Sequence, residues 1–163
     1  MRNIRTFREE DWTSVWPMLR QVFRAGETYA LPPDISEQQA RRVWIDVPVE
    51  TFVMTGSGGE ILGTYYLKVN HPGPGSHVCN CGYVVAAEAR GQGVGRALGS
   101  HSLREAKERG FRAMQFNLVV STNVVALRLW KKLGFRTIGT VPGAFNSPKY
   151  GYVDAFVMYR ELT

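Results

Sequence analysis

Three glycines and two arginines fall within EARGQGVGRA, residues 88–97. The glycines lack a Cβ atom, so an anion could come close to the backbone of this stretch. A helix that begins here leaves its first N–H groups without partners, and its dipole adds about half a positive charge. Arg90 and Arg96 can add charge-assisted hydrogen bonds from either side. This pattern favours a site for phosphate groups, with an incidental glycine turn as the alternative.

Two common phosphate motifs do not fit the stretch. A P-loop needs Gly-Lys-Ser or Gly-Lys-Thr after its glycines, and neither is present. A dinucleotide fingerprint spaces its glycines G-x-G-x-x-G in the first βαβ unit of a chain, whereas G-x-G-x-G lies here past the middle. The spacing therefore excludes both of these classes.

Two asparagines interrupt runs that are otherwise typical of strands. Asn80 lies in VCNCGYVV and Asn117 in QFNLVV, although asparagine is depleted in strands. A buried amide needs hydrogen-bond partners, and a bound ligand is one candidate. A structural hydrogen bond is the other candidate, and the sequence leaves both open.

The cysteines raise the question of a metal site. His77, Cys79 and Cys81 alternate along one run and would share one strand face. Alternate residues of a strand stand about 6.6 Å apart, which is too far for easy convergence on one tetrahedral ion. No second ligand cluster accompanies them, so we expect no metal.

Periodicity predicts the elements that must position these residues. Apolar residues spaced by three and four predict a helix from about Glu9 to Arg24. Pro17 lies inside that helix and is expected to kink or interrupt it. Ser36 and Gln39 form a capping-box start for a second, short helix.

The helix that follows the glycine stretch should end at Gly110, and a later helix at Gly134. The order of elements is strand, two helices, three strands, helix, strand, helix, two strands, which indicates a single mixed α/β sheet with helices on its faces. The predicted strands cover residues 3–7, 51–55, 61–70, 78–85, 112–120, 135–141 and 151–162, with a loop over 142–150.

The composition narrows the class of protein. A chain of 163 residues, 44% hydrophobic and 21% charged, fits one globular domain over residues 1–163. Its formal charge of +6 suits an anionic partner, but the scattered arginines argue against nucleic acid. No apolar run nears the ~18 residues of a membrane-spanning helix, and the N-terminus lacks the pattern of a signal peptide. With only two cysteines, we expect a reducing, cytoplasmic location.

The glycine stretch also carries a family resemblance. Residues 90–97, RGQGVGRA, resemble the acyl-CoA pyrophosphate loop of the GNAT superfamily of N-acetyltransferases. Residues 123–135, NVVALRLWKKLGF, resemble the second motif of that family, and the element order matches its fold along nearly the whole chain. The resemblance implies the GNAT fold, an α/β (α+β) architecture with a single mixed, mostly antiparallel sheet of about seven strands flanked by about four helices.

The resemblance implies a role for each matching position. Backbone groups from Gln92 to Arg96 would hold the CoA pyrophosphate. Val85 would pair its backbone with the pantetheine arm, which in this family fills the space where two parallel strands splay apart. Asn123 would contact the pantetheine arm or the region near the sulfur, and it also suits a helix N-cap. The implied cofactor-binding residues are Val85, Arg90, Gly91, Gln92, Gly93, Val94, Gly95, Arg96 and Asn123.

The catalytic positions depart from the usual family pattern. Trp130 stands where many members place a proton-donating tyrosine, and an indole N–H is far too weak an acid for that role. Asn80 stands where a glutamate base is common. A narrower resemblance, to fungal acetyltransferases that detoxify proline analogues such as azetidine-2-carboxylate, implies that Asn80 and Asn117 lie at the reaction centre. We hypothesise that Asn80 polarises the acetyl carbonyl while Asn117 orients the amine.

These features predict an acetyl-CoA-dependent N-acetyltransferase acting on a small, amino-acid-like amine, with proline analogues among the candidates. Direct transfer in a ternary complex is expected, because neither cysteine is placed beside a base. A protein or peptide amine, or an aminoglycoside, is the alternative substrate, and an acyl-CoA sensor without turnover is the alternative function. We expect no nucleic-acid or membrane partner; a homodimer is common in the family and is one expected assembly.

Overall fold

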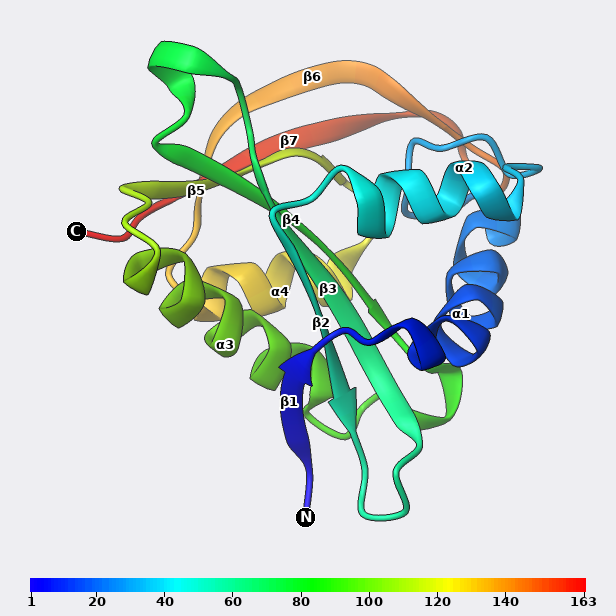
Figure 1. Ribbon diagram of the computed structural model, residues 1–163. Coiled ribbons are helices and arrows are strands. Elements are labelled where there is room, and N and C mark those ends of the chain that lie inside the picture. Colours follow the sequence, from blue (N-terminus) through cyan, green and yellow to red (C-terminus); the bar gives the residue numbers. More distant parts are fainter.

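One seven-stranded sheet runs through the computed structural model, which describes residues 1–163 (Figure 1). The strand order is β1-β2-β3-β4-β5-β7-β6. Neighbouring strands are antiparallel except for β4 and β5, which are parallel. This arrangement confirms the mixed, mostly antiparallel sheet predicted from the sequence. The strands are β1 (Asn3–Thr6), β2 (Glu50–Thr55), β3 (Ile61–Val69), β4 (Val78–Val85), β5 (Ala113–Val120), β6 (Arg136–Ser147) and β7 (Gly151–Glu161).

Helices cover both faces of the sheet. In Figure 1, α1 and α2 lie against one face, and α3 and α4 lie against the other. The predicted capping box is present, because Ser36 and Gln39 exchange hydrogen bonds at the start of α2. The helices are α1 (Trp12–Ala25), α2 (Glu37–Arg41), α3 (Val94–Glu108) and α4 (Val124–Lys132), with a 3₁₀ turn (Glu9–Asp11) before α1 and a π-helical turn (Arg42–Asp46) after α2.

Pro17 does not interrupt α1, so that part of the sequence prediction is wrong. The helix continues on both sides of the proline. A proline inside a helix costs about 3 kcal/mol, chiefly because one backbone hydrogen bond is lost. Val15, Leu19 and Phe23 on the same helix are at most 1% exposed. Burying each of them stabilises the fold by about 1.5–3 kcal/mol, which outweighs the proline.

The loop predicted over residues 142–150 is mostly strand. β6 extends to Ser147, and its pairing with β7 shifts register between Val141 and Phe145. Pro142 falls within that shift. It is tolerated because β6 is the edge strand, where a missing N–H breaks no hydrogen bond on the outer side.

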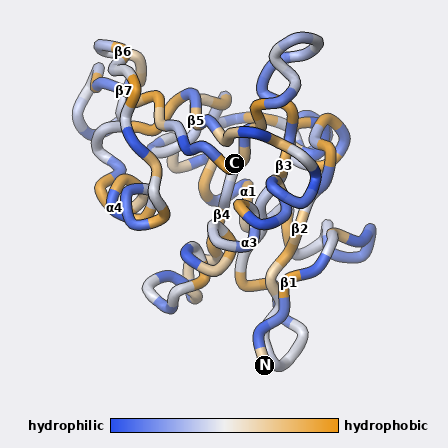
Figure 2. The backbone as a smooth tube through the Cα atoms, turned by 90° about the vertical axis from the view of Figure 1, so that its left-hand side faces the viewer, coloured by the Kyte–Doolittle hydropathy of each residue, from blue (hydrophilic) through white to orange (hydrophobic).

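The buried core follows the central strands. Figure 2 shows hydrophobic segments along β2 and β3, and the largest fully buried side chains include Trp44, Tyr65 and Leu67. Each helix is too short or too polar to cross a lipid bilayer.

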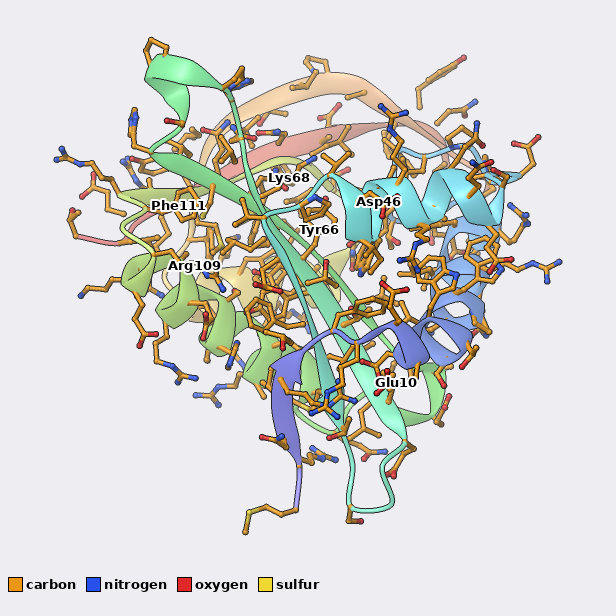
Figure 3. All side chains as sticks on the ribbon, viewed as in Figure 1. Glu10, Asp46, Tyr66, Lys68, Arg109 and Phe111 are labelled. Carbon is orange, nitrogen blue, oxygen red and sulfur yellow. The ribbon has the colours of Figure 1, made fainter.

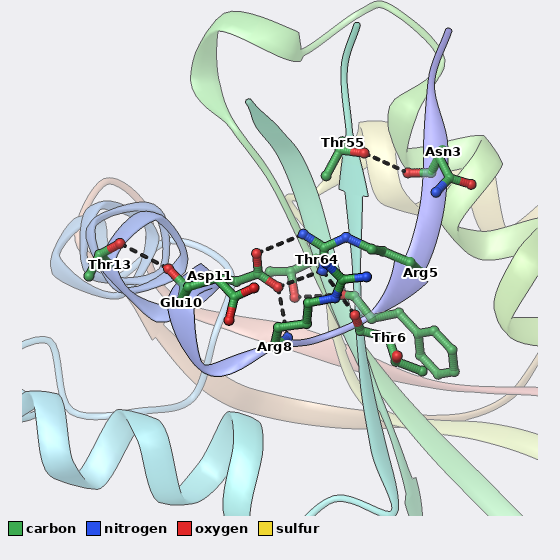
Figure 4. Close-up of polar contacts among 10 residues, drawn as sticks. Asn3, Arg5, Thr6, Arg8, Glu10, Asp11, Thr13, Thr55 and Thr64 are labelled. Atoms are coloured by element: carbon green, nitrogen blue, oxygen red, sulfur yellow. Dashed lines mark hydrogen bonds and ion pairs between the residues drawn. The ribbon is translucent and has the colours of Figure 1, made fainter. Parts of the chain in front are cut away.

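A partly buried ion pair joins β1 to the turn that precedes α1 (Figure 4). Two guanidinium nitrogens of Arg5 donate to the Asp11 carboxylate at 2.7 and 2.8 Å. Asp11 is only 6% exposed, and it also accepts a hydrogen bond from the Arg8 backbone N–H at 2.8 Å. The hydrogen bond from Arg5, more than any other contact, lowers the pKa of Asp11. This pair fixes the strand whose first residues reach the glycine stretch.

Candidate active site

The parallel strands β4 and β5 begin side by side and then separate. Their pairing is confined to Val78 with Ala113 and Cys79 with Met114, at the start of both strands. Beyond those two pairs, β4 continues to Val85 without a partner strand on that side. The sheet therefore contains an opening between β4 and β5 that widens toward the glycine stretch; we call it the β4–β5 gap.

Hydrogen bonds to β3 show which backbone groups face this gap. Ala86 donates to the Leu62 carbonyl, and Val78 accepts from the Asn70 N–H, so even-numbered residues of β4 bond to β3. In an extended strand the alternate residues direct their N–H and C=O groups to the opposite side. The backbone of Tyr83 and that of Val85 consequently face the β4–β5 gap.

The glycine stretch connects β4 to α3 and leaves open space beside its backbone. Gly91 and Gly93 have φ angles of +73° and +79°, in the left-handed region that favours glycine. No atom lies within 4 Å of a Cβ placed on either residue. Gly93 is the N-cap of α3 and supplies no side-chain cap, and the first helical bond runs from Ala97 to its carbonyl. The N–H groups of residues 94–96 are thus left to bind an anion.

Arginines surround this N-terminus. Arg90 and Arg96 are both exposed, and neither side chain forms an ion pair within the chain. Arg2 donates to the Gln92 carbonyl at 2.6 Å and to its side-chain oxygen at 2.8 Å. Sequence reasoning missed Arg2, whose role depends on the pairing of β1 far from the loop in sequence. Arg2, the residue before β1, therefore holds the loop in place, while the guanidinium groups of Arg90 and Arg96 form no ion pair.

Gly95 lies near the start of α3, and Asn123 lies at the start of α4. A Cβ on Gly95 would lie 3.4 Å from Leu129 and 3.8 Å from Val85, which are ordinary contact distances. The Asn123 side-chain oxygen accepts from the Ala126 N–H at 3.3 Å, so its predicted role as the N-cap of α4 is confirmed. Its amide NH₂ is not used by the cap.

Trp130 is a core residue on the α4 side of the gap. It is 8% exposed, and its ring lies 4.8 Å from that of Tyr83 and 4.7 Å from that of Phe116. Tyr83 and Phe116 therefore point to the same face of the sheet. The Tyr83 hydroxyl is 2.7 Å from Ser102 on α3, so it too is directed into the core.

Asn80 lies on the other face, toward α1 and α2. Its position is three residues from Tyr83, and strand side chains alternate between faces. Asn80 is 8% exposed, yet its amide has no hydrogen-bond partner within the chain, and none of its polar atoms is fully sealed from solvent. A nearly buried amide with free donor and acceptor atoms is suited to bind a ligand.

Asn117 occupies the same face but is exposed. It lies in β5 where the pairing with β7 shifts register between Phe116 and Val119. Its NH₂ donates to the Asn70 side-chain oxygen at 2.7 Å, and its oxygen accepts from Gln115 at 3.0 Å. Of the two candidates that the sequence left open, the structure shows hydrogen bonds within the chain for Asn117, to the side chains of Asn70 and Gln115.

Tyr66 and Lys68 also lie on this face of the sheet. Register pairs Tyr66 with Gly82 and Lys68 with Asn80. A Cβ on Gly82 would be 2.5 Å from the Tyr66 ring, so only glycine leaves room for that ring across β4. The Lys68 ammonium is 5.4 Å from the centre of the same ring, and Figure 3 labels both residues on β3 beside the segment carrying Asp46. The glycine within VCNCGYVV is the signal that could have indicated Tyr66.

The cysteines are buried and free. Burial raises the pKa of the Cys81 thiol well above its usual range, so Cys81 is a poor nucleophile. His77, Cys79 and Cys81 do not converge, since the chain has no cluster of three His, Cys, Asp or Glu side chains that could hold a metal ion.

Comparison with known proteins places this geometry in a family. The sequence pattern of the Acetyltransferase (GNAT) family matches residues 10–135. N-acetyltransferase aca1 of Schizosaccharomyces pombe is 41% identical, over 92% of this chain and 79% of its own length. The structure of a GCN5-related N-acetyltransferase from Kribbella flavida superposes with a TM-score of 0.94 at 46% identity, covering 98% of this chain and 97% of that one.

A more distant structure shows the same fold with the cofactor. It is a GNAT superfamily phosphinothricin acetyltransferase from Sinorhizobium meliloti in complex with acetyl-CoA, with a TM-score of 0.86 at 21% identity over 98% of this chain and 88% of that one. The resemblance found in the two sequence motifs is therefore confirmed across the fold. This chain belongs to the GNAT family and is an N-acetyltransferase.

Proposed function

We propose that acetyl-CoA binds with its pyrophosphate on the glycine stretch and its pantetheine arm in the β4–β5 gap. The observation that carries this proposal is that the β4–β5 gap leads to the glycine stretch. The backbone of β4 is unpaired on the gap side at Val85, and the chain then runs through the glycine stretch to the free N–H groups of residues 94–96. Arg90 and Arg96 supply charge at the same end. A sheet edge with unpaired groups is suited to the amides of an extended arm.

We propose direct transfer to a neutral amine. The amine nitrogen attacks the thioester carbon, the C–N bond forms, and the C–S bond breaks with the electron pair leaving on sulfur. Asn80 donates a hydrogen bond to the carbonyl oxygen as negative charge develops there. Asn117 accepts a hydrogen bond from the amine and orients its lone pair. Water takes the proton lost by nitrogen, and the CoA thiolate leaves without a protein acid.

The substrate we propose is an amine that also carries a carboxylate. Lys68 lies directly across the ladder from Asn80, is half-buried, and has no acidic partner within the chain. A cation on the same face as Asn80 favours a ligand with a negative group near its reacting nitrogen. Amino acids and proline analogues have that arrangement, whereas aminoglycosides and polyamines do not.

The test is release of the CoA thiol from acetyl-CoA with a panel of amines. The panel contains azetidine-2-carboxylate, hydroxyprolines, free amino acids, polyamines, an aminoglycoside and a short peptide. We expect turnover with the first three groups. Turnover confined to the peptide or the aminoglycoside would contradict the proposed substrate class.

The carboxylate can be tested separately with the methyl ester of whichever amino acid is active. Lys68→Gln should raise KM for the free acid at least about tenfold, since a hydrogen bond to a charged group contributes about 1.5–3 kcal/mol. It should leave KM for the ester almost unchanged. Lys107→Gln, on α3 and so on the opposite face of the sheet, is the matched control. Equal effects of Lys68→Gln on acid and ester would contradict a role in carboxylate binding.

A further inference from the structure

The side chain of Tyr29 enters the β4–β5 gap from the segment between α1 and α2. Its hydroxyl accepts a hydrogen bond from the Tyr83 backbone N–H at 2.7 Å and donates one to the Tyr83 carbonyl at 2.8 Å. Both of these backbone groups face the gap. The Tyr29 hydroxyl thus makes the two hydrogen bonds that a neighbouring strand would make with the backbone of Tyr83.

The contact of Tyr29 with Tyr83 bears on cofactor binding because of where Tyr83 lies along β4. Tyr83 lies between Val85, where we place the pantetheine arm, and Asn80, which we place at the reaction centre. Gap-facing residues of a strand stand about 6.6 Å apart, so an arm running inward past Val85 reaches Tyr83 next. The thioester and the Tyr29 hydroxyl would therefore compete for the same N–H.

Aromatic packing and protonation hold the phenol in this place. The Tyr29 ring packs edge-on against Phe23 at 5.5 Å and against Trp44 at 5.9 Å. Loss of solvent around the hydroxyl raises the pKa of Tyr29 well above its usual range, so the group stays protonated and can donate as well as accept. An unpaired backbone N–H and C=O in this setting would otherwise be costly.

We propose that the Tyr29 hydroxyl is a place-holder for the thioester oxygen of acetyl-CoA. It satisfies the Tyr83 backbone before acetyl-CoA binds, and the acetyl group displaces it on binding. Tyr29 is in this sense a positioning residue for the cofactor. Displacement frees the segment between α1 and α2 on the face where Asn80 lies, so loading of the cofactor is coupled to opening of the amine side. This inference rests on the proposed path of acetyl-CoA.

The first test compares acetyl-CoA with CoA, which has no carbonyl at this position. Tyr29→Phe keeps the ring packing and removes only the hydroxyl. We expect it to tighten acetyl-CoA binding about two- to tenfold, the range for one net hydrogen bond, and to leave CoA binding almost unchanged. Tyr65→Phe is the matched control, because the Tyr65 hydroxyl bonds to His101 at 2.8 Å on the opposite face. An unchanged ratio of the two affinities in Tyr29→Phe would overturn the inference.

The second test needs no variant. In the wild-type protein labelled with ¹⁵N, acetyl-CoA should shift the Tyr83 amide resonance and change its exchange with solvent relative to CoA. Identical Tyr83 signals with the two ligands would overturn the inference while leaving the proposed function intact. Failure of both ligands to bind would overturn the proposed function, and the inference with it.

Discussion

The Asn80 amide can donate a hydrogen bond at any physiological pH, but it cannot take a proton from an amine. It is nearly buried, it has no partner within the chain, and it lies on the face turned toward α1 and α2. Those properties suit a group that stabilises an oxyanion rather than a general base. In our account, Asn80 therefore stabilises the oxyanion at the position where a glutamate base is common in the family.

Replacing Asn80 by alanine should lower turnover about 10²- to 10³-fold, the usual effect of losing one oxyanion donor. The affinity for acetyl-CoA should change little, because the pyrophosphate and the arm are held elsewhere. Steady-state rates and calorimetric titration measure the two quantities separately. Asn146→Ala, at an exposed position of β6, is the control. An undiminished rate in Asn80→Ala would remove Asn80 from the reaction centre.

The contacts and exposure of single residues were the hardest properties to predict from the sequence. Asn123 was recognised as a cap because capping depends on neighbours along the chain. The exposure of Asn117 depends on a shift in pairing with β7, which no local pattern encodes. The contact of Tyr29 with Tyr83 joins positions 54 residues apart, and nothing in the loop around Tyr29 indicates it.

At the level of elements, the glycine stretch can bind an anion because it joins the end of β4 to the N-terminus of α3. Gly93 has a left-handed φ of +79°, and no atom lies within 4 Å of a Cβ placed on it. Any other residue would be strained there by about 1–2 kcal/mol.

Gly93→Ala should therefore have two separable effects. The free energy of unfolding should fall by about 1 kcal/mol through backbone strain. Acetyl-CoA affinity should fall at least about tenfold, because the new methyl group occupies space that a phosphate needs. Gly59→Ala is the control: Gly59 has a φ of +87° and equally open surroundings, but it lies in the turn between β2 and β3. If both variants bind acetyl-CoA normally, the loop does not hold the pyrophosphate.

Elements were predicted well because hydrophobic periodicity and glycine stops are local. The order of all strands and helices was correct, and so were both glycine-terminated helices. Two errors share one cause: Pro17 and Pro142 were treated as breaks. Buried packing around Pro17 and the edge position of β6 override the local preference, and both are properties of the assembled sheet.

The whole molecule holds the proposed site by anchoring the elements on both faces of the sheet. On the face of α3, the Tyr65 hydroxyl is 2.8 Å from His101, and His101 packs at 5.2 Å against Phe52. Burial, more than any nearby charge, lowers the pKa of His101 from its ordinary value of 6.5. The folded protein thus keeps this imidazole neutral at a pH where the unfolded chain would protonate it.

Stability should accordingly fall on acidification. Below pH 6.5 the unfolded chain binds a proton at His101 before the folded chain does, so the free energy of unfolding decreases as the pH drops toward the lowered pKa. The slope for one proton is at most about 1.4 kcal/mol per pH unit. Urea titrations between about pH 7.5 and pH 5, which bracket the ordinary pKa of histidine, measure this slope.

His101→Gln is the informative variant for this effect. It should be less stable than the wild type near pH 7.5 and should lose much of the slope over that window. Asp11 contributes separately at lower pH: its lowered pKa means that stability is lost as the pH falls through the pKa of the folded state. An unchanged slope in His101→Gln would show that another group is responsible.

The most direct measurement of the central claim is a crystal structure of the protein with acetyl-CoA. Our account predicts the pyrophosphate on the N–H groups of residues 94–96 and the pantetheine arm between β4 and β5, with amide hydrogen bonds to Val85. The acetyl oxygen should lie at the Tyr83 N–H, with Tyr29 displaced. Acetyl-CoA bound at another surface, or β4 and β5 closed onto each other along their length, would contradict the account.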